Sequence, residues 1–132
     1  MRVNPLLSLA LMVAASVHFV QLGDHAAESP YLAAGFLIAG VLQLLLATVV
    51  PVQPSRPVYR TVVVLDVFLI LLYVGHVLVG IPLPTGAGLD FVFSPRESVD
   101  VYGVITVIAE LAAVALAYAG LFAVARPRPA AG

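Results

Sequence analysis

Cysteine and lysine are absent from this sequence, and charged residues of any kind are scarce. Without cysteine the chain has no disulfides, thiolate metal sites, iron–sulfur clusters or dithiol redox pairs. Six arginines and seven acidic residues give a net charge of −1, so the chain offers no basic surface to nucleic acid. Charged residues make up 10% of the chain, against about 25% in an ordinary soluble domain. A sequence that is 62% hydrophobic and carries so little charge is expected to face lipid.

Four apolar segments are each long enough to cross a bilayer, which takes about 20 residues in an α-helix. The sequence therefore predicts an all-α protein, a transmembrane four-helix bundle that forms one domain of 132 residues. The expected helices cover residues 5–27, 30–50, 57–80 and 95–125, with a longer outer loop over residues 81–94.

Three of the expected helix starts carry a capping side chain directly before a proline, at Asn4-Pro5, Ser29-Pro30 and Ser94-Pro95. Proline is tolerated at the first helical position because the missing N–H has no helical partner there. Glu97 stands three residues after Ser94 and completes the pattern of a capping box. The fourth helix is therefore predicted to begin at Pro95.

The expected outer loop is rich in proline and glycine and carries two aromatic residues, Phe91 and Phe93. These side chains could fold the loop back onto the mouth of the bundle as an apolar lid. Alternatively, the loop is a plain connector whose aromatic residues lie at the lipid interface.

Arginine placement predicts an orientation. One side of the membrane would carry Arg2, Arg56, Arg60, Arg126 and Arg128. Only Arg96 falls on the other side, so the positive-inside rule places both termini in the cytoplasm. We expect a multi-pass protein of the bacterial inner membrane.

Polar residues inside the apolar segments are the candidates for function, because ionisable groups at membrane depth are costly and usually face a partner, a cavity or a ligand. Histidines and carboxylates gather toward the outer side, and the candidate ligands of a metal ion are His18, His25, Glu28, His76, Asp100 and Glu110. Imidazole and carboxylate suit zinc, copper or iron. Haem is disfavoured because His18 and His76 differ in depth by about one helical turn. Inter-helix hydrogen bonds are the alternative role for these residues.

Three further polar residues are assigned structural roles. Gln43 is expected to bond between helices at about 1 kcal/mol. Asp66 is placed in the inner half, where it would pair with Arg60, with a proton relay as the less favoured alternative. Tyr73 stands one turn from His76 and could orient that imidazole by a hydrogen bond, or simply pack.

The end of the first helix is ambiguous. His18, His25 and Glu28 share one face if the helix continues through Gly23, because they are spaced at helical intervals. If Gly23 ends the helix, His25 and Glu28 belong to a solvated turn.

Small residues recur every four positions at Ala109, Ala113 and Ala117. Such rows let helices approach closely in lipid. The row could pack within the bundle or against another protein.

Short motifs are spread over most of the chain, in the order His18, Asp24-His25, Glu28, Ala34-Gly35-Phe36, Gln43, Gly80-Ile81-Pro82-Leu83-Pro84, Asp100 and Glu110. In this pattern the chain resembles small bacterial four-helix membrane proteins of uncharacterised function. The resemblance implies a compact four-span protein and supplies no reaction.

The leading functional hypothesis is a small membrane protein with an outward-facing site of histidine and carboxylate that holds a transition metal. The alternatives are a non-catalytic accessory subunit of a larger membrane complex and a proton-coupled carrier or channel subunit. The lipid bilayer is the expected partner, with a homo-oligomer or a larger complex as further possibilities. An enzyme is least supported, because no nucleophile and base form a known motif.

Overall fold

Four long helices make up nearly all of the structure. The computed structural model describes residues 3–85 and 90–125. The helices are α1 (Val3–Glu28), α2 (Pro30–Val52), α3 (Arg56–Val79) and α4 (Val101–Ala125). All four are long and apolar enough to cross a membrane, which confirms the predicted all-α, four-helix architecture.

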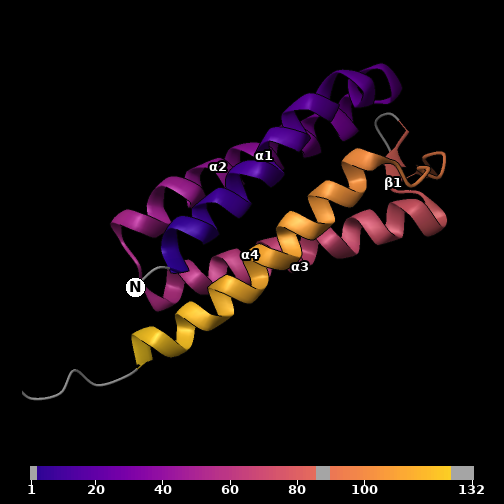
Figure 1. Ribbon diagram of the computed structural model, residues 1–132. Coiled ribbons are helices and arrows are strands. Elements are labelled where there is room, and N and C mark those ends of the chain that lie inside the picture. Colours follow the sequence, from indigo (N-terminus) through magenta and orange to yellow (C-terminus); the bar gives the residue numbers. More distant parts are fainter. Residues whose placement is uncertain (1–2, 86–89, 126–132) are drawn as a thin grey trace, which may run out of the picture.

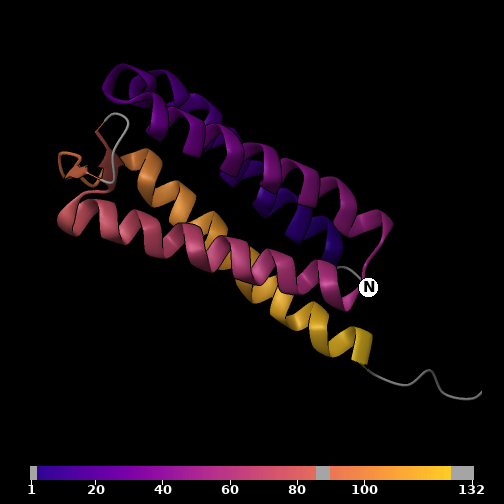
Figure 2. The ribbon, with the colours of Figure 1, turned by 180° about the vertical axis from the view of Figure 1, so that it is seen from behind.

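Consecutive helices run in opposite directions (Figures 1 and 2). Short turns join α1 to α2 and α2 to α3. α1 packs along both α2 and α4, and α3 packs mainly on α4. α2 and α3 share few contacts, so the bundle is loosest along that seam.

α1 passes through Gly23 without interruption and ends at Glu28. The N–H of Ser29 still bonds to the carbonyl of His25 at 2.9 Å, and the Ser29 hydroxyl then accepts from the N–H of Tyr31 to cap α2. The open question about helix one is therefore resolved, and His18, His25 and Glu28 share one continuous helix.

The fourth helix begins later than predicted, at Val101 and not at Pro95. Asp100 provides its cap, since its Oδ1 accepts from the N–H of Gly103 at 2.7 Å. The Ser94 hydroxyl accepts instead from the N–H of Ile81, and the N–H of Glu97 bonds to the carbonyl of His76. The capping-box pattern was wrong because this segment is tied to the end of α3, which a local sequence motif does not reveal.

The connection between α3 and α4 begins at Gly80, whose φ of 86° ends α3 in a conformation that favours glycine. Two short antiparallel strands follow, β1 (Pro82–Pro84) and β2 (Phe91–Phe93), with Pro82 opposite Phe93. The sequence had predicted only a loop here, and its residues 86–89 lie outside the described part. This hairpin sits at the end of the bundle where α1 and α3 finish (Figure 1).

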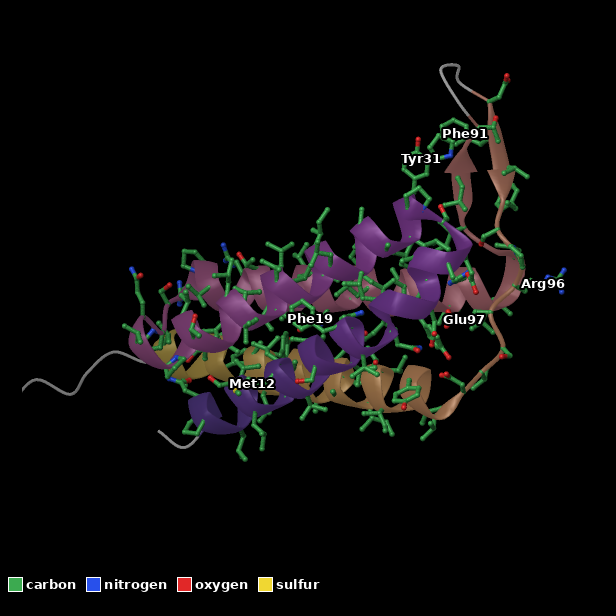
Figure 3. All side chains as sticks on the ribbon, turned by 90° about the horizontal axis from the view of Figure 1, so that it is seen from above. Met12, Phe19, Tyr31, Phe91, Arg96 and Glu97 are labelled. Carbon is green, nitrogen blue, oxygen red and sulfur yellow. The ribbon has the colours of Figure 1, made fainter. Side chains whose placement is uncertain are left out.

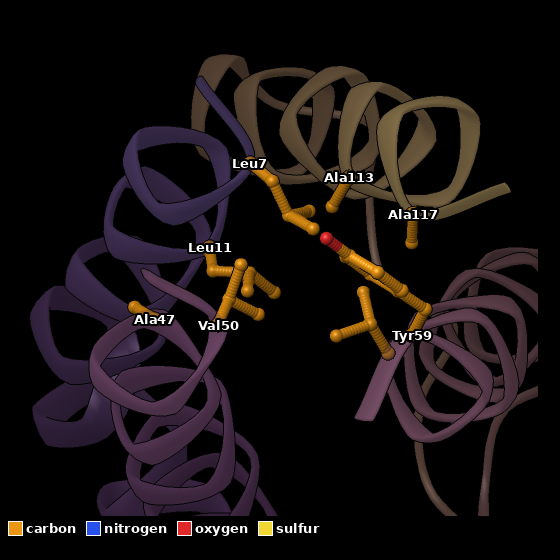
Figure 4. Packing of buried hydrophobic residues seen from close by; sticks show 8 residues of the cluster. Leu7, Leu11, Ala47, Val50, Tyr59, Ala113 and Ala117 are labelled. Carbon is orange, nitrogen blue, oxygen red and sulfur yellow. The ribbon is translucent and has the colours of Figure 1, made fainter. Parts of the chain in front are cut away.

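The apolar core, whose packing Figure 4 shows, lies toward the opposite end, where α1 and α3 begin. Its buried residues are Leu7, Leu11, Ala47, Val50, Tyr59, Val62, Ala113 and Ala117. Ala113 and Ala117 have no exposed surface, so the alanine row on α4 packs within the bundle. The Tyr59 ring fits against Gly120, where an added Cβ would lie 2.7 Å from it.

Candidate functional site

Each helix contributes one polar side chain to a buried group that we call the central tetrad: His18, Gln43, Asp66 and Glu110. The Gln43 amide nitrogen donates to Asp66 Oδ1 at 2.9 Å and to Glu110 Oε1 at 3.1 Å. His18 Nε2 lies 3.4 Å from the same Glu110 oxygen. Gln43 thus bridges two carboxyl groups. Asp66, expected to pair with Arg60, joins this group.

The tetrad does not satisfy its own hydrogen-bonding capacity. Gln43 Oε1, Asp66 Oδ2 and His18 Nδ1 are buried and find no partner among the described residues. An unsatisfied buried polar group costs about 1–3 kcal/mol, so three such atoms in one place are unusual for a purely structural network.

A second polar group, which we call the end cluster, lies nearer the hairpin and consists of His25, His76 and Glu97. His76 Nδ1 lies 2.9 Å from Glu97 Oε2, and His25 Nε2 lies 3.7 Å from Glu97 Oε1. Glu97 Oε2 nevertheless has no aligned hydrogen bond to any described residue, so its approach to His76 is a close polar contact. Glu28, with a side chain 53% exposed, sits at the edge of the cluster, 3.6 Å from His25 Nδ1.

Glu97 was missed as a site residue because the sequence suggested a helix cap for it. The sequence gave one indication of its role: Glu97 lies at the start of the expected fourth helix, at the same end of the bundle as His25 and His76. In Figure 3 the Arg96 side chain points away from the bundle and Glu97 points inward.

Phe36 on α2 separates the two polar groups. Its ring lies edge-on to His18, with centroids 5.4 Å apart, and nearly stacks on His25 at 3.9 Å. The ring therefore fixes both imidazoles of α1 from one side.

A cavity of about 260 Å³ opens beside both groups. Its polar lining includes His18, Tyr73, His76, Glu97 and Glu110, together with Gln21 and Thr106. Its apolar walls are formed by Leu32, Phe36, Ala39, Leu69, Leu72 and residues 81–84 of the hairpin. The Tyr73 hydroxyl is buried and has no hydrogen-bond partner among residues 3–85 and 90–125, so of its two expected roles the bond to His76 is not formed.

The hairpin covers the cavity in a different way from the predicted lid. The side of the hairpin that lines the cavity is β1 with Ile81, whereas Phe91 and Phe93 are 60% and 61% exposed. The aromatic residues therefore face outward, as in the connector alternative, while the proline-rich strand forms the wall.

The six predicted metal ligands are divided among different places. His18 and Glu110 belong to the tetrad, His25 and His76 belong to the end cluster with Glu28 at its edge, and Asp100 caps α4. Within residues 3–85 and 90–125, no three histidine or acidic side chains converge as a metal ion would require.

Comparison of the chain with protein-family models, with curated proteins and with solved structures gave no match. The resemblance to small four-helix membrane proteins thus stays a prediction, and functional inference rests on the geometry of the chain itself.

Proposed function

We propose that this protein is a multi-pass membrane protein that binds a small amphiphilic molecule in the cavity at its hairpin end. One observation carries the proposal: a cavity with apolar walls has carboxylate, imidazole and hydroxyl groups gathered at its polar side. Ligand sites are typically apolar pockets in which a few polar groups fix the orientation.

The polar lining favours a head group that donates hydrogen bonds. Glu97 and Glu110 are acceptors when ionised, and no arginine lines the cavity in the described part of the chain. A phosphate or carboxylate head would meet two acids without the arginine that usually pairs with such groups. A hydroxyl or an ammonium head matches the lining.

The route to the cavity supports a ligand that arrives from the membrane. All four helices line the cavity, and among them are α2 and α3, which share few contacts with each other. Tyr31 and Leu72 line it from these helices and are 53% and 39% exposed. Both sit on surfaces that would face lipid in a spanning bundle.

The inner-membrane location and the orientation are part of this proposal. Arg56 and Arg60 begin α3, at the end remote from Arg96, which agrees with a cytoplasmic apolar half and an outward-facing cavity. The remaining arginines used for the prediction, Arg2, Arg126 and Arg128, lie outside the described residues. Association with a second copy or a larger complex also stays a prediction.

The test uses three probes with the same alkyl chain and different heads: octylamine, octanol and octanoate. Thermal unfolding of the purified protein in detergent should shift to higher temperature with octylamine and octanol, and not with octanoate. A ligand at 100 times its dissociation constant stabilises by about 2.7 kcal/mol, which a melting curve detects.

Two glycine variants provide a matched pair. At the helical glycines Gly35 and Gly75, an added Cβ would meet no described residue outside its own stretch of helix within 4 Å, and of the two only Gly35 lines the cavity. Gly35→Leu should abolish the shift, and Gly75→Leu should retain it. Equal shifts in both variants, or no shift in the natural protein, would refute the proposal, and stoichiometric metal in the purified protein would favour the metal hypothesis in its place.

A further inference from the structure

The proposed site contains more carboxyl groups than are needed to bind the head group of one ligand. Asp66 and Glu110 both accept hydrogen bonds from the one amide group of Gln43. Asp66 has no exposed surface and Glu110 is 1% exposed. Two negative charges so placed repel each other strongly, and like-charged carboxyls that share a site hold a proton between them.

Titratable groups surround Glu110 from α1, from α3 and from the segment before α4, whereas α2 supplies the amide of Gln43. α1 supplies His18 at 3.4 Å, and α3 supplies Asp66 through the amide of Gln43. On the cavity side lie His76 and Glu97, which contact each other. No arginine forms an ion pair with the tetrad in the described part of the chain.

Only one of the two bridged carboxyls can meet a ligand. Glu110 and His18 line the cavity, whereas Asp66 does not. Asp66 is therefore a positioning residue: it acts on a ligand through Gln43 and through the proton that it shares.

We propose that the ligand is a cationic amphiphile with an ammonium head, and that Glu110 binds this head in exchange for one proton held by Asp66, Glu110 and His18 together. This inference rests on the proposed function and specifies its ligand class. The ammonium enters as the proton leaves to water at the hairpin end, so the charge of the site does not change. Because charge inside a bilayer is costly, an exchange that conserves charge removes that penalty.

The exchange has a definite pH signature. Below about pH 9 a primary amine stays protonated, so its own charge does not vary. Octylammonium should bind up to tenfold more tightly for each unit of pH increase while the tetrad retains its proton, since one proton is released per ligand. Octanol, which brings no charge, should bind equally well at each pH. Isothermal titration calorimetry in two buffers of different ionisation enthalpy counts the released protons.

Variants separate the two carboxyls. Glu110→Gln should abolish both the pH dependence and the preference for octylammonium while octanol still binds, which shows that the cavity is intact. Asp66→Asn should keep the preference and lose most of the pH dependence. Asp24→Asn changes an exposed carboxyl outside both the cavity and the end cluster, and it serves as the matched control, with binding unchanged.

The outcomes distinguish the two proposals. If octanol binds and the affinity for octylammonium does not vary with pH, or if Glu110→Gln keeps the pH dependence, proton exchange is wrong and the proposed function stands. If neither probe binds the natural protein, the proposed function fails and this inference fails with it. Release of one proton on binding, lost in Glu110→Gln, establishes the exchange.

Discussion

The two halves of this bundle differ in what they bury: one buries apolar side chains, and the other buries polar side chains beside a cavity. In the apolar half, side chains such as Leu7, Leu11 and Tyr59 are fully buried, and small residues on α4 let the helices approach closely. In the polar half, the tetrad and the end cluster border a cavity, and several buried polar atoms find no partner within residues 3–85 and 90–125. The buried core of one half consists of apolar side chains, whereas the other half has a cavity lined by ionisable side chains.

This difference indicates where stability and function reside. Helix association in lipid depends on close packing, because burial of apolar surface brings no gain over lipid tails. The apolar half meets that requirement. The polar half contains the unsatisfied groups and empty space that a folded protein retains mainly where it binds something.

The largest effect is expected from truncation of Tyr59 in the apolar half. Tyr59→Ala should lower the free energy of unfolding by about 3–5 kcal/mol, because a large buried side chain leaves a void. Tyr59→Phe should cost only about 1 kcal/mol, since it removes just the hydrogen bond to Asn4 Oδ1, which is 2.6 Å long.

The same truncation in the polar half sharpens the comparison. Tyr73 is on the same helix and borders the cavity, and its hydroxyl has no partner in the part of the chain that the structure describes. Tyr73→Ala should cost less than half as much as Tyr59→Ala when both are unfolded by SDS in mixed micelles. Equal costs would mean that the two halves are packed alike.

An intermediate effect is expected from a methyl group added to a buried glycine. Gly120→Ala forces the new Cβ against the Tyr59 ring and should destabilise by about 1–3 kcal/mol. Gly103→Ala meets the hydroxyl end of Tyr73 instead, which can move into the cavity. Thermal melting should therefore show a smaller loss for Gly103→Ala, and a larger loss there would contradict an open polar half.

The smallest effect is expected on the outer side of the hairpin. Phe93→Ser changes an exposed side chain and should alter stability by no more than about 0.5 kcal/mol. It should also leave the melting shift with octylamine unchanged. Leu83→Ser, in the strand that lines the cavity, should reduce that shift. If Phe93→Ser reduced it instead, the aromatic residues would form the lid after all.

Much of the fold could be predicted from local patterns. The uncharged second span and the Ser29-Pro30 cap indicated α2, and the observed helix begins at Pro30. The start of α4 was mispredicted because Ser94 and Glu97 match a capping box, while their actual partners, Ile81 and His76, are distant in sequence. A helix cap forms between residues close in sequence, but the groups that compete for a capping side chain can be distant in sequence.

The candidate site could be predicted only as a list of polar residues that are costly to place at membrane depth. His18, His76 and Glu110 were selected because ionisable groups inside a membrane are costly and usually face a partner, a cavity or a ligand. Gln43 was assigned a role as inter-helix glue, and it does bridge helices, yet its two partners are the acidic residues on which the proposed exchange depends. Glu97 was less evident, because the capping box at the expected start of the fourth helix already gave it a structural role.

The sequence alone determined that the chain forms four apolar helices with rare polar residues inside them, because length, hydropathy and the cost of charge in lipid act residue by residue. Only the tertiary structure decided which polar residues meet. Depth along a helix follows from counting residues, but the direction in which a side chain points depends on how all four helices rotate to pack. That rotation brings Asp66 to Gln43, places Glu97 between two histidines and leaves a cavity beside them. The lack of cysteine and lysine and the low charge had predicted only an apolar helical bundle.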